Sequence, residues 1–149
     1  MDTRIKEAIS LFEDVMIYGT EQVLRSMDEQ FWNQYSPEQL HLLKLLKKEE
    51  RLTAGRLAAL QGVHKSAISG RTKKLLAKEL IRVVETPDRR SKLYELTAEG
   101  ERVIGKAREL THRYVQEQLV DHVNDEEIDQ FLRIFRKLKA IIKTEEVDE

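Results

Sequence analysis

The side chains that could do chemistry in this chain are cations and short polar residues gathered in its middle third. The run KSAISGRTKK at residues 65–74 interleaves lysines and an arginine with serine, alanine and glycine. A second group, Asp88-Arg89-Arg90, follows Pro87 between two short apolar-alternating runs. Ammonium and guanidinium groups bind phosphates, and small residues beside them let a helix approach base edges. This combination indicates contact with a nucleic acid.

Charge is distributed unevenly along the chain, although the net charge is only -1. Residues 1–40 carry three basic and eight acidic side chains, residues 41–92 carry fourteen and five, and residues 93–149 carry nine and fourteen. A basic centre between acidic flanks suits a chain whose middle meets phosphates while its ends avoid them. Chance clustering of solvated lysines is the alternative that charge alone leaves open.

Other classes of chemistry find little support. The chain has no cysteine, which excludes disulfides, thiolate metal sites and cysteine-based redox sensing. Its four histidines show no metal-ligand spacing. No nucleophile is paired with a base, no glycine loop cradles a phosphate, and no carboxylate pair is clearly set in a cleft. We therefore expect no enzymatic activity, no metal and no cofactor.

The length of 149 residues, 40% of them hydrophobic, suits one sizeable core with helical extensions. The N-terminal stretch MDTRIKEAISLFEDVM interleaves charges with apolar residues, unlike a signal peptide. No later segment approaches membrane-spanning length. We expect a cytoplasmic protein.

Hydrophobic periodicity and capping residues predict helices at both ends of the chain. Apolar residues at helical spacing predict one long helix over about residues 2–33. The stretch SPEQ at 36–39 is a capping box that opens a leucine-rich helix through about Lys48, and we expect its leucines to be buried. Thr97 caps a further helix, and an Asn-Asp pair at 124–125 opens the last one.

The basic run lies within a pair of helices that fits a helix-turn-helix. A short helix capped by Thr53 precedes a second helix over about residues 64–78. Ala58 is small where the helices cross, Gly62 occupies the turn, and Ile68 fills the core from the second helix. The separation of four and then six residues is the one that this motif uses.

Residues 64–78 separate into two faces on a helical wheel. One face, expected in the core, holds Ile68, Thr72, Leu75 and Leu76. The other is small and basic and holds Ser66, Ala67, Ser69, Gly70, Lys73 and Lys74. A solvated helix face usually carries glutamates, whereas the first acidic residue here is Glu79, so contact with DNA is favoured over simple solvation.

Position along this helix suggests the role of each polar side chain. Three residues near the helix N-terminus can serve bases or phosphates, namely Lys65, Ser66 and Ser69. Two later lysines are expected to hold phosphates, namely Lys73 and Lys74. Arg71 lies at the border between the faces, and two interpretations stay open for it: a reader of guanine, or a side chain that runs along the edge of the core.

The residues after this helix predict a two-stranded wing. Residues 81–85 and 92–96 alternate apolar and polar side chains and read as two strands, with residues 86–91 as their connection. Pro87 rigidifies that connection, and Asp88 can hold a neighbouring arginine in place. The two arginines project at the tip, where a guanidinium suits the narrow minor groove. An ordinary hairpin with solvated arginines is the alternative.

These motifs resemble the MarR (multiple antibiotic resistance regulator) family of bacterial and archaeal transcription factors. The family's wing sequence, Asp-x-Arg, then leucine, an alternating strand and Leu-Thr-x-x-Gly, is matched by Asp88, Arg90, Leu93, Leu96, Thr97 and Gly100. The resemblance covers essentially the whole chain. It implies a mainly α fold with a small antiparallel β wing, as a single MarR-type domain over residues 1–149. Within it, residues 36–100 would form the winged helix-turn-helix, and residues 1–33 and 101–146 the dimerisation helices.

Two positions depart from the family pattern. Arg71 stands where the family usually has an apolar residue, and Gly70 stands where it usually has a larger one. This leaves the base preference open. By resemblance, the family's wing arginine carries over to Arg90, supported by Asp88. The expected DNA-contacting set is Lys65, Ser66, Ser69, Gly70, Arg71, Lys73, Lys74, Asp88, Arg89 and Arg90.

The ends of the chain predict a second copy of it as a partner. The first helix and the last two carry more apolar surface than one small winged domain can cover, so we expect a homodimer, as the resemblance also implies. Two-fold symmetry then predicts a palindromic operator with half-sites about 10 base pairs apart. By resemblance, a small aromatic or phenolic effector binds between the dimerisation helices and the DNA-binding region. Candidates to line that site, for which plain core packing is the commoner role, are Phe12, Met16, Tyr18, Trp32 and Tyr35.

Two classes of function remain at this point. The first is a sequence-specific transcriptional regulator of double-stranded DNA, a dimeric repressor that a small molecule releases from its operator. The second is a winged-helix protein-interaction module whose basic face binds an acidic partner. A preference among DNA sequences at physiological salt distinguishes the first from the second.

Overall fold

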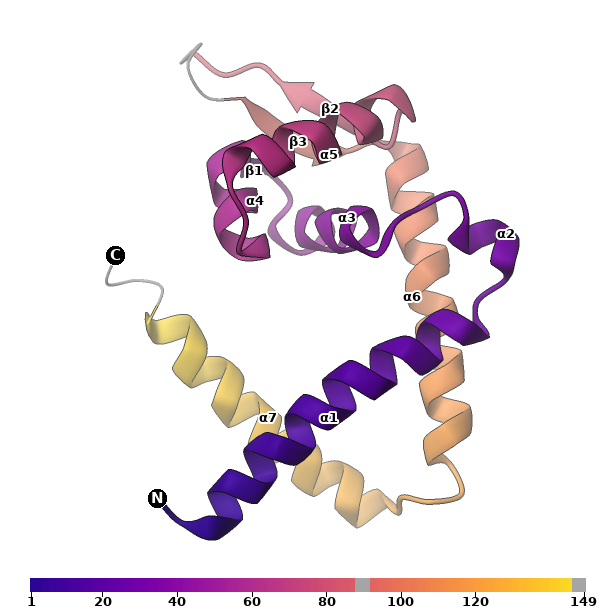
Figure 1. The fold of residues 1–149 in the computed structure, drawn as a ribbon, viewed down its shortest axis with the longest axis vertical. Coiled ribbons are helices and arrows are strands. Elements are labelled where there is room, and N and C mark those ends of the chain that lie inside the picture. Colours follow the sequence, from indigo (N-terminus) through magenta and orange to yellow (C-terminus); the bar gives the residue numbers. More distant parts are fainter. Residues whose placement is uncertain (88–91, 146–149) are drawn as a thin grey trace. The chain divides into compact units, whose positions relative to one another are not determined.

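The computed structural model describes residues 1–87 and 92–145 and shows a mainly helical chain with one small antiparallel sheet (Figure 1). This confirms the fold class predicted from the sequence. The elements are, in chain order, α1 (Thr3–Ser26), α2 (Glu29–Trp32), α3 (Pro37–Glu49), β1 (Leu52–Thr53), α4 (Ala54–Gln61), α5 (Lys65–Ala77), β2 (Ile81–Val84), β3 (Leu93–Leu96), α6 (Ala98–Leu119) and α7 (Asp125–Glu145).

The first predicted helix is in fact two helices. The chain leaves the helical conformation at Met27, whose φ of -77° and ψ of 146° are extended. Asp28 then caps α2, because its carboxylate accepts a hydrogen bond from the backbone N–H of Gln30. The prediction of one helix over residues 2–33 is therefore wrong. An aspartate satisfies the free N–H groups of a new helix start better than it supports a helix interior.

Helix α3 begins as its sequence predicts and forms the centre of the core. Ser36 Oγ accepts a hydrogen bond from the Gln39 backbone N–H at 3.1 Å, and Gln39 Oε1 accepts one from the Ser36 N–H at 3.3 Å, which completes the capping box. The predicted burial of the leucines is confirmed for four of the five, which are at most 5% exposed: Leu40, Leu42, Leu43 and Leu46. Leu45 is half-buried against the same core.

The sheet has three strands, in the order β1-β3-β2. The predicted wing strands are present, each one residue shorter than expected, and pair antiparallel with Val83 opposite Tyr94. The two-residue strand β1, which pairs Leu52 with Tyr94, was not predicted, because two residues are too few to show a period. Strand β1 anchors the hairpin to the start of α4.

The start of α6 is fixed by two adjacent features. Thr97 Oγ1 accepts a hydrogen bond from the Gly100 N–H at 3.0 Å and donates one to the carbonyl oxygen of Glu79 at 2.6 Å, so the predicted threonine cap is confirmed. At Gly100 the helix passes so close to the preceding loop that a Cβ atom would lie 2.0 Å from the carbonyl oxygen of Leu80. Beyond it, Val103 and Ile104 of α6 are buried in the core.

The chain divides into two compact units, Met1–Thr111 and His112–Glu149. In the second unit, Asn124 opens α7 by accepting a hydrogen bond from the Glu127 N–H at 2.9 Å. No residue of α1 is buried, and none is buried among residues 125–143 of α7. Within residues 1–87 and 92–145, no helix is both long enough and apolar enough to cross a membrane.

Candidate nucleic-acid interface

Helices α4 and α5 form the predicted helix-turn-helix. Thr53 Oγ1 caps α4 by accepting a hydrogen bond from the Arg56 N–H at 3.1 Å. Helix α4 ends at Gly62, whose φ of +65° is left-handed and therefore favours glycine. Ala58 is 5% exposed and Ile68 is fully buried. All three positions that the sequence assigned to this motif thus occupy the expected places.

Helix α5 presents one face to the core and the other to solvent. The buried face carries Ile68, Thr72 and Leu75, and Thr72 satisfies its hydroxyl by donating to the carbonyl oxygen of Ile68 at 2.9 Å. Leu76 is half-buried beside them. On the solvent side the prediction is confirmed for five of the six residues, which are exposed together with Lys65: Ser66, Ser69, Gly70, Lys73 and Lys74. Ala67, which was also expected on this face, is half-buried.

The lysines on the outer face of α5 are available to a partner. Among the residues that the structure describes, none of Lys65, Lys73 and Lys74 forms an ion pair. The first turn of α5 contains no acidic residue, and its N-terminal N–H groups receive no side-chain cap from His64. A helix N-terminus attracts anions, so this face is positive at its start as well as along its length.

Two arginines beside the sheet share one internal carboxylate. The carboxylate of Glu95 on β3 accepts hydrogen bonds from Arg51 Nε at 2.9 Å and from Arg82 Nε at 2.7 Å. These bonds, that from Arg82 first, hold the pKa of Glu95 below its ordinary value. Arg51 and Arg82 thus have an internal ion-pair partner, whereas Lys65, Lys73 and Lys74 of α5 form no ion pair with another described residue.

The side chain of Arg71 reaches from α5 to the end of α4. Its Nη1 atom donates a hydrogen bond to Oε1 of Gln61 on α4 at 2.6 Å, and the side chain is half-buried. Of the two interpretations left open by the sequence, this position corresponds to the edge of the core. The sequence alone contains no local signal for the contact, since the two residues lie on different helices.

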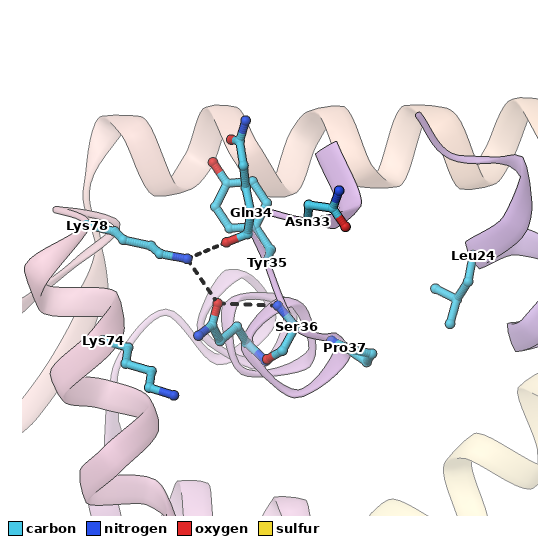
Figure 2. Close-up of a pocket in the computed structure, with 9 residues that line it drawn as sticks. Leu24, Asn33, Gln34, Tyr35, Ser36, Pro37, Lys74 and Lys78 are labelled. Carbon is cyan, nitrogen blue, oxygen red and sulfur yellow. Dashed lines mark hydrogen bonds between the residues drawn. The ribbon is translucent and has the colours of Figure 1, made fainter. Parts of the chain in front are cut away.

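Lys78, the residue just after α5, is held by the loop before α3 (Figure 2). Its ammonium group donates to the carbonyl oxygen of Gln34, lies 3.4 Å from Gln39 Oε1, and stands 5.1 Å from the centre of the Tyr35 ring. Sequence reasoning missed this residue, because its partners are about 40 positions away. These groups border an open hollow of about 710 Å³ lined by Leu24, Asn33, Gln34, Tyr35, Ser36, Pro37, Gln39, Lys74 and Lys78.

The wing tip cannot be placed in the same way. Its predicted DNA contacts, Asp88, Arg89 and Arg90, lie outside the described residues. The strands on either side are described, and β3 lies between β1 and β2 in the sheet. The connection therefore begins and ends on a hairpin that is fixed to the helix-turn-helix.

Comparison with known proteins agrees with this geometry. The model of the MarR family matches residues 35–92, which include the helix-turn-helix and β2 and end just before β3. The chain is 37% identical over 145 residues to YdgG of Bacillus subtilis (strain 168), an uncharacterized HTH-type transcriptional regulator, and the match covers 95% of each protein. This chain belongs to the MarR family. It is thus a transcriptional regulator with a DNA-binding helix-turn-helix.

Another curated relative and two solved structures match this chain at lower identity. TcaR of Staphylococcus aureus, an HTH-type transcriptional regulator, is 29% identical over 128 residues, with 84% of this chain and 82% of TcaR covered. A MarR family protein from Bacillus stearothermophilus superposes with a TM-score of 0.76 at 24% identity, over 96% of this chain and 99% of that one. A mutant MarR from E. coli complexed with operator DNA superposes with a TM-score of 0.61 at 18% identity, over 93% and 99%.

Proposed function

We propose that this MarR family chain is a homodimeric, sequence-specific repressor that occupies a palindromic operator and leaves it when a small molecule binds. The observation that carries the proposal is the outer face of α5, where Lys65, Lys73 and Lys74 are exposed and form no ion pair with another described residue. Small residues between these lysines allow the helix to enter the major groove. The related fold of a MarR from E. coli was solved with operator DNA, which supports the same use of the fold here.

In this proposal the contacts divide between the two grooves. Ser66, Ser69 and Gly70 face base edges in the major groove, while the three lysines hold phosphates. The wing carries Arg89 and Arg90 into the adjacent minor groove, with Asp88 as their support. Two copies related by two-fold symmetry then bind half-sites about 10 base pairs apart.

Selection of bound fragments from random duplex DNA tests the proposal. We expect one inverted-repeat sequence to be recovered, with an affinity in the nanomolar range and a preference of about a thousandfold over a scrambled duplex. Equal affinity for both duplexes at physiological salt would contradict the proposal. That result would favour an acidic protein as the partner of the basic face.

The proposed dimer rests on the apolar side chains of α1 and α7. In the single chain, α7 alone exposes eight large apolar residues by 37% to 61%: Ile128, Phe131, Leu132, Ile134, Phe135, Leu138, Ile141 and Ile142. Apolar surface of this extent at regular helical spacing is typical of a protein interface. The proposed dimerisation region therefore comprises residues 1–33 and 101–146.

Sedimentation equilibrium distinguishes a dimer from a monomer. We expect the wild type to be a dimer, and Phe131→Glu to shift the equilibrium towards the monomer because the carboxylate would be buried without a partner. Arg133→Glu is the matched control, since residue 133 lies on the opposite side of the helical wheel from Phe131 and Phe135. A monomeric wild type at micromolar concentration would contradict the proposed dimer.

The proposed effector site is the hollow beside the loop before α3 (Figure 2). It combines the ring of Tyr35 with the cations Lys74 and Lys78, a lining suited to an aromatic molecule with a phenolate or carboxylate group. Of the other candidate residues, Phe12, Met16 and Tyr18 are about half exposed, and the side chain of Trp32 lies outside the described part of the chain. Release of operator DNA by salicylate-type compounds, lost in a Tyr35→Ala variant that still binds DNA, would support the site.

A further inference from the structure

We propose that the hydrogen bond between Gln61 and Arg71 is an internal brace that fixes the position of helix α5 relative to α4 and α3. Arg71 would then affect the affinity for DNA without contacting DNA itself. The inference rests on the proposed function, because a brace on α5 affects operator binding only if α5 meets the operator. It assigns Arg71 a positioning role in place of the base contact that its sequence position also allows.

Gln61 is the last residue of α4, and its amide group contacts two other helices. Oε1 accepts the hydrogen bond from Arg71 Nη1 of α5 at 2.6 Å. Nε2 donates to the carbonyl oxygen of Glu38 in α3 at 3.2 Å and lies 3.2 Å from Nδ1 of His41. One neutral side chain therefore connects α3, α4 and α5.

The chemistry of Arg71 fixes the direction of every bond in this group. A guanidinium group only donates, so Gln61 must present its carbonyl oxygen to Arg71 and its amino group to Glu38 and His41. His41 then meets the amino group with a lone pair on Nδ1, as neutral imidazole does. Burial, followed by the charges of Lys44 and Arg71, lowers the pKa of His41, which favours this neutral form.

Arg71 is poorly placed to read a base. It is half-buried at the side of α5, whereas Ser69, Gly70 and Lys73 are exposed on the outer face. To reach guanine, the guanidinium would have to abandon a short charge-assisted hydrogen bond and leave the Gln61 oxygen unpaired in a half-buried site. An apolar residue, usual in the family at this position, could not make that bond.

Among the residues that the structure describes, the brace is one of two polar contacts that hold α5. Within residues 1–87 and 92–145, the side-chain hydrogen bonds that join α5 and its cap to other elements come from Arg71 at mid-helix and from Lys78 at the C-terminal end. With Lys78 alone, the N-terminal half of α5 would be positioned only by apolar packing, which is less directional. That half carries Lys65, Ser66 and Ser69.

A double-mutant cycle measured on DNA tests the brace. The variants are Arg71→Leu, Gln61→Leu and the double variant, with Lys73→Ala as the control that removes a phosphate contact. Affinity is measured by fluorescence anisotropy at several salt concentrations, on the operator selected with the wild type, after circular dichroism shows that each variant is folded. Arg71→Lys, which keeps one donor, extends the test if a leucine variant does not fold.

We expect each single leucine variant to bind the operator on the order of fivefold to tenfold more weakly, because the net effect of one hydrogen bond is of that size. The double variant should bind no more weakly than the weaker single variant, since both remove one shared contact. The slope of log affinity against log salt should stay at the wild-type value in all three, whereas Lys73→Ala should reduce its magnitude by about 0.9. Arg71→Lys should recover part of the affinity.

Two results would overturn the brace. One is a reduced salt slope for Arg71→Leu with unaltered affinity for Gln61→Leu, which would make Arg71 a direct DNA contact. The other is wild-type affinity in both single variants. A wild-type protein with no preferred duplex would instead refute the proposed function, and the two failures are therefore distinguishable.

Discussion

Among the glycines, Gly100 is the position where substitution by alanine is expected to lower the free energy of unfolding most. A Cβ atom there would lie 2.0 Å from the carbonyl oxygen of Leu80 and 3.0 Å from its carbonyl carbon. Both atoms belong to the backbone, and the oxygen also accepts the Thr97 N–H at 3.1 Å, so it cannot move aside without breaking that bond. Contact between a methyl carbon and an oxygen requires well over 3 Å. Gly100→Ala must therefore displace the start of α6 from the sheet.

The size of the destabilisation follows from that displacement of α6. Overpacking costs about 1–3 kcal/mol where side chains can yield, and we expect the upper end or more here, because the loss of the Thr97 hydrogen bond adds about 1 kcal/mol. Gly105→Ala is the matched control: it is the same substitution on the same helix, with no atom within 4 Å of the new methyl group. It should stabilise the protein by about 1 kcal/mol through helix propensity.

The free energy of unfolding of both variants is measured by urea unfolding followed by circular dichroism, at one fixed protein concentration. We expect the free energies of unfolding of the two variants to differ by about 4 kcal/mol or more. Equal stabilities for Gly100→Ala and the wild type would refute the reasoning, because they would mean that the backbone at Leu80 is free to move. A destabilised Gly105→Ala would show instead that the control methyl group meets a partner subunit.

Three further predictions concern the interface and the sheet. Lys73→Ala should weaken operator binding at low salt and reduce the magnitude of the salt slope by about 0.9, measured by anisotropy; an unchanged slope would remove Lys73 from the phosphate contacts. Gly70→Ala should raise the free energy of unfolding by about 1 kcal/mol, because no atom lies within 4 Å of the added methyl group, and should weaken operator binding, because the helix could no longer approach the bases as closely. A variant that gains stability and keeps full affinity would contradict the proposed approach. For Glu95, whose pKa the bonds from Arg82 and Arg51 hold below the ordinary value of 4.5, the stabilisation is present above about pH 4.5 and is lost as the pH falls through the lowered pKa. Glu95→Gln should therefore lower the Tm at pH 7, with a difference from the wild type that shrinks in acid; a constant difference would show that the charge plays no part.

Local signals made much of the fold predictable. The capping box at Ser36, the threonine caps at 53 and 97 and the left-handed Gly62 each act within a few residues, so their residue types alone determine the local conformation. The two faces of α5 follow from the same short-range periodicity. The break at Met27 was also encoded locally, by Asp28 followed by Glu29, but the longer hydrophobic period concealed it.

Contacts between distant residues could not be predicted in this way. Lys78 meets Gln34 and Gln39 only because α5 packs beside α3, and the choice of Arg71 between DNA and Gln61 depends on side-chain positions across two helices. A charge pattern shows that a helix is basic. It does not show which of the cations the protein has already engaged.

The ammonium group of Lys78 has a consequence for how a small molecule would affect the proposed binding of DNA. It serves the carbonyl oxygen of Gln34 and the amide oxygen of Gln39 at the rim of the hollow, and it belongs to the residue that terminates α5. An anion that entered the hollow would compete for the same protons. An anion bound at Lys78 would then weaken one of the contacts that hold the end of α5, so that filling the hollow would loosen this helix without any rearrangement of the core.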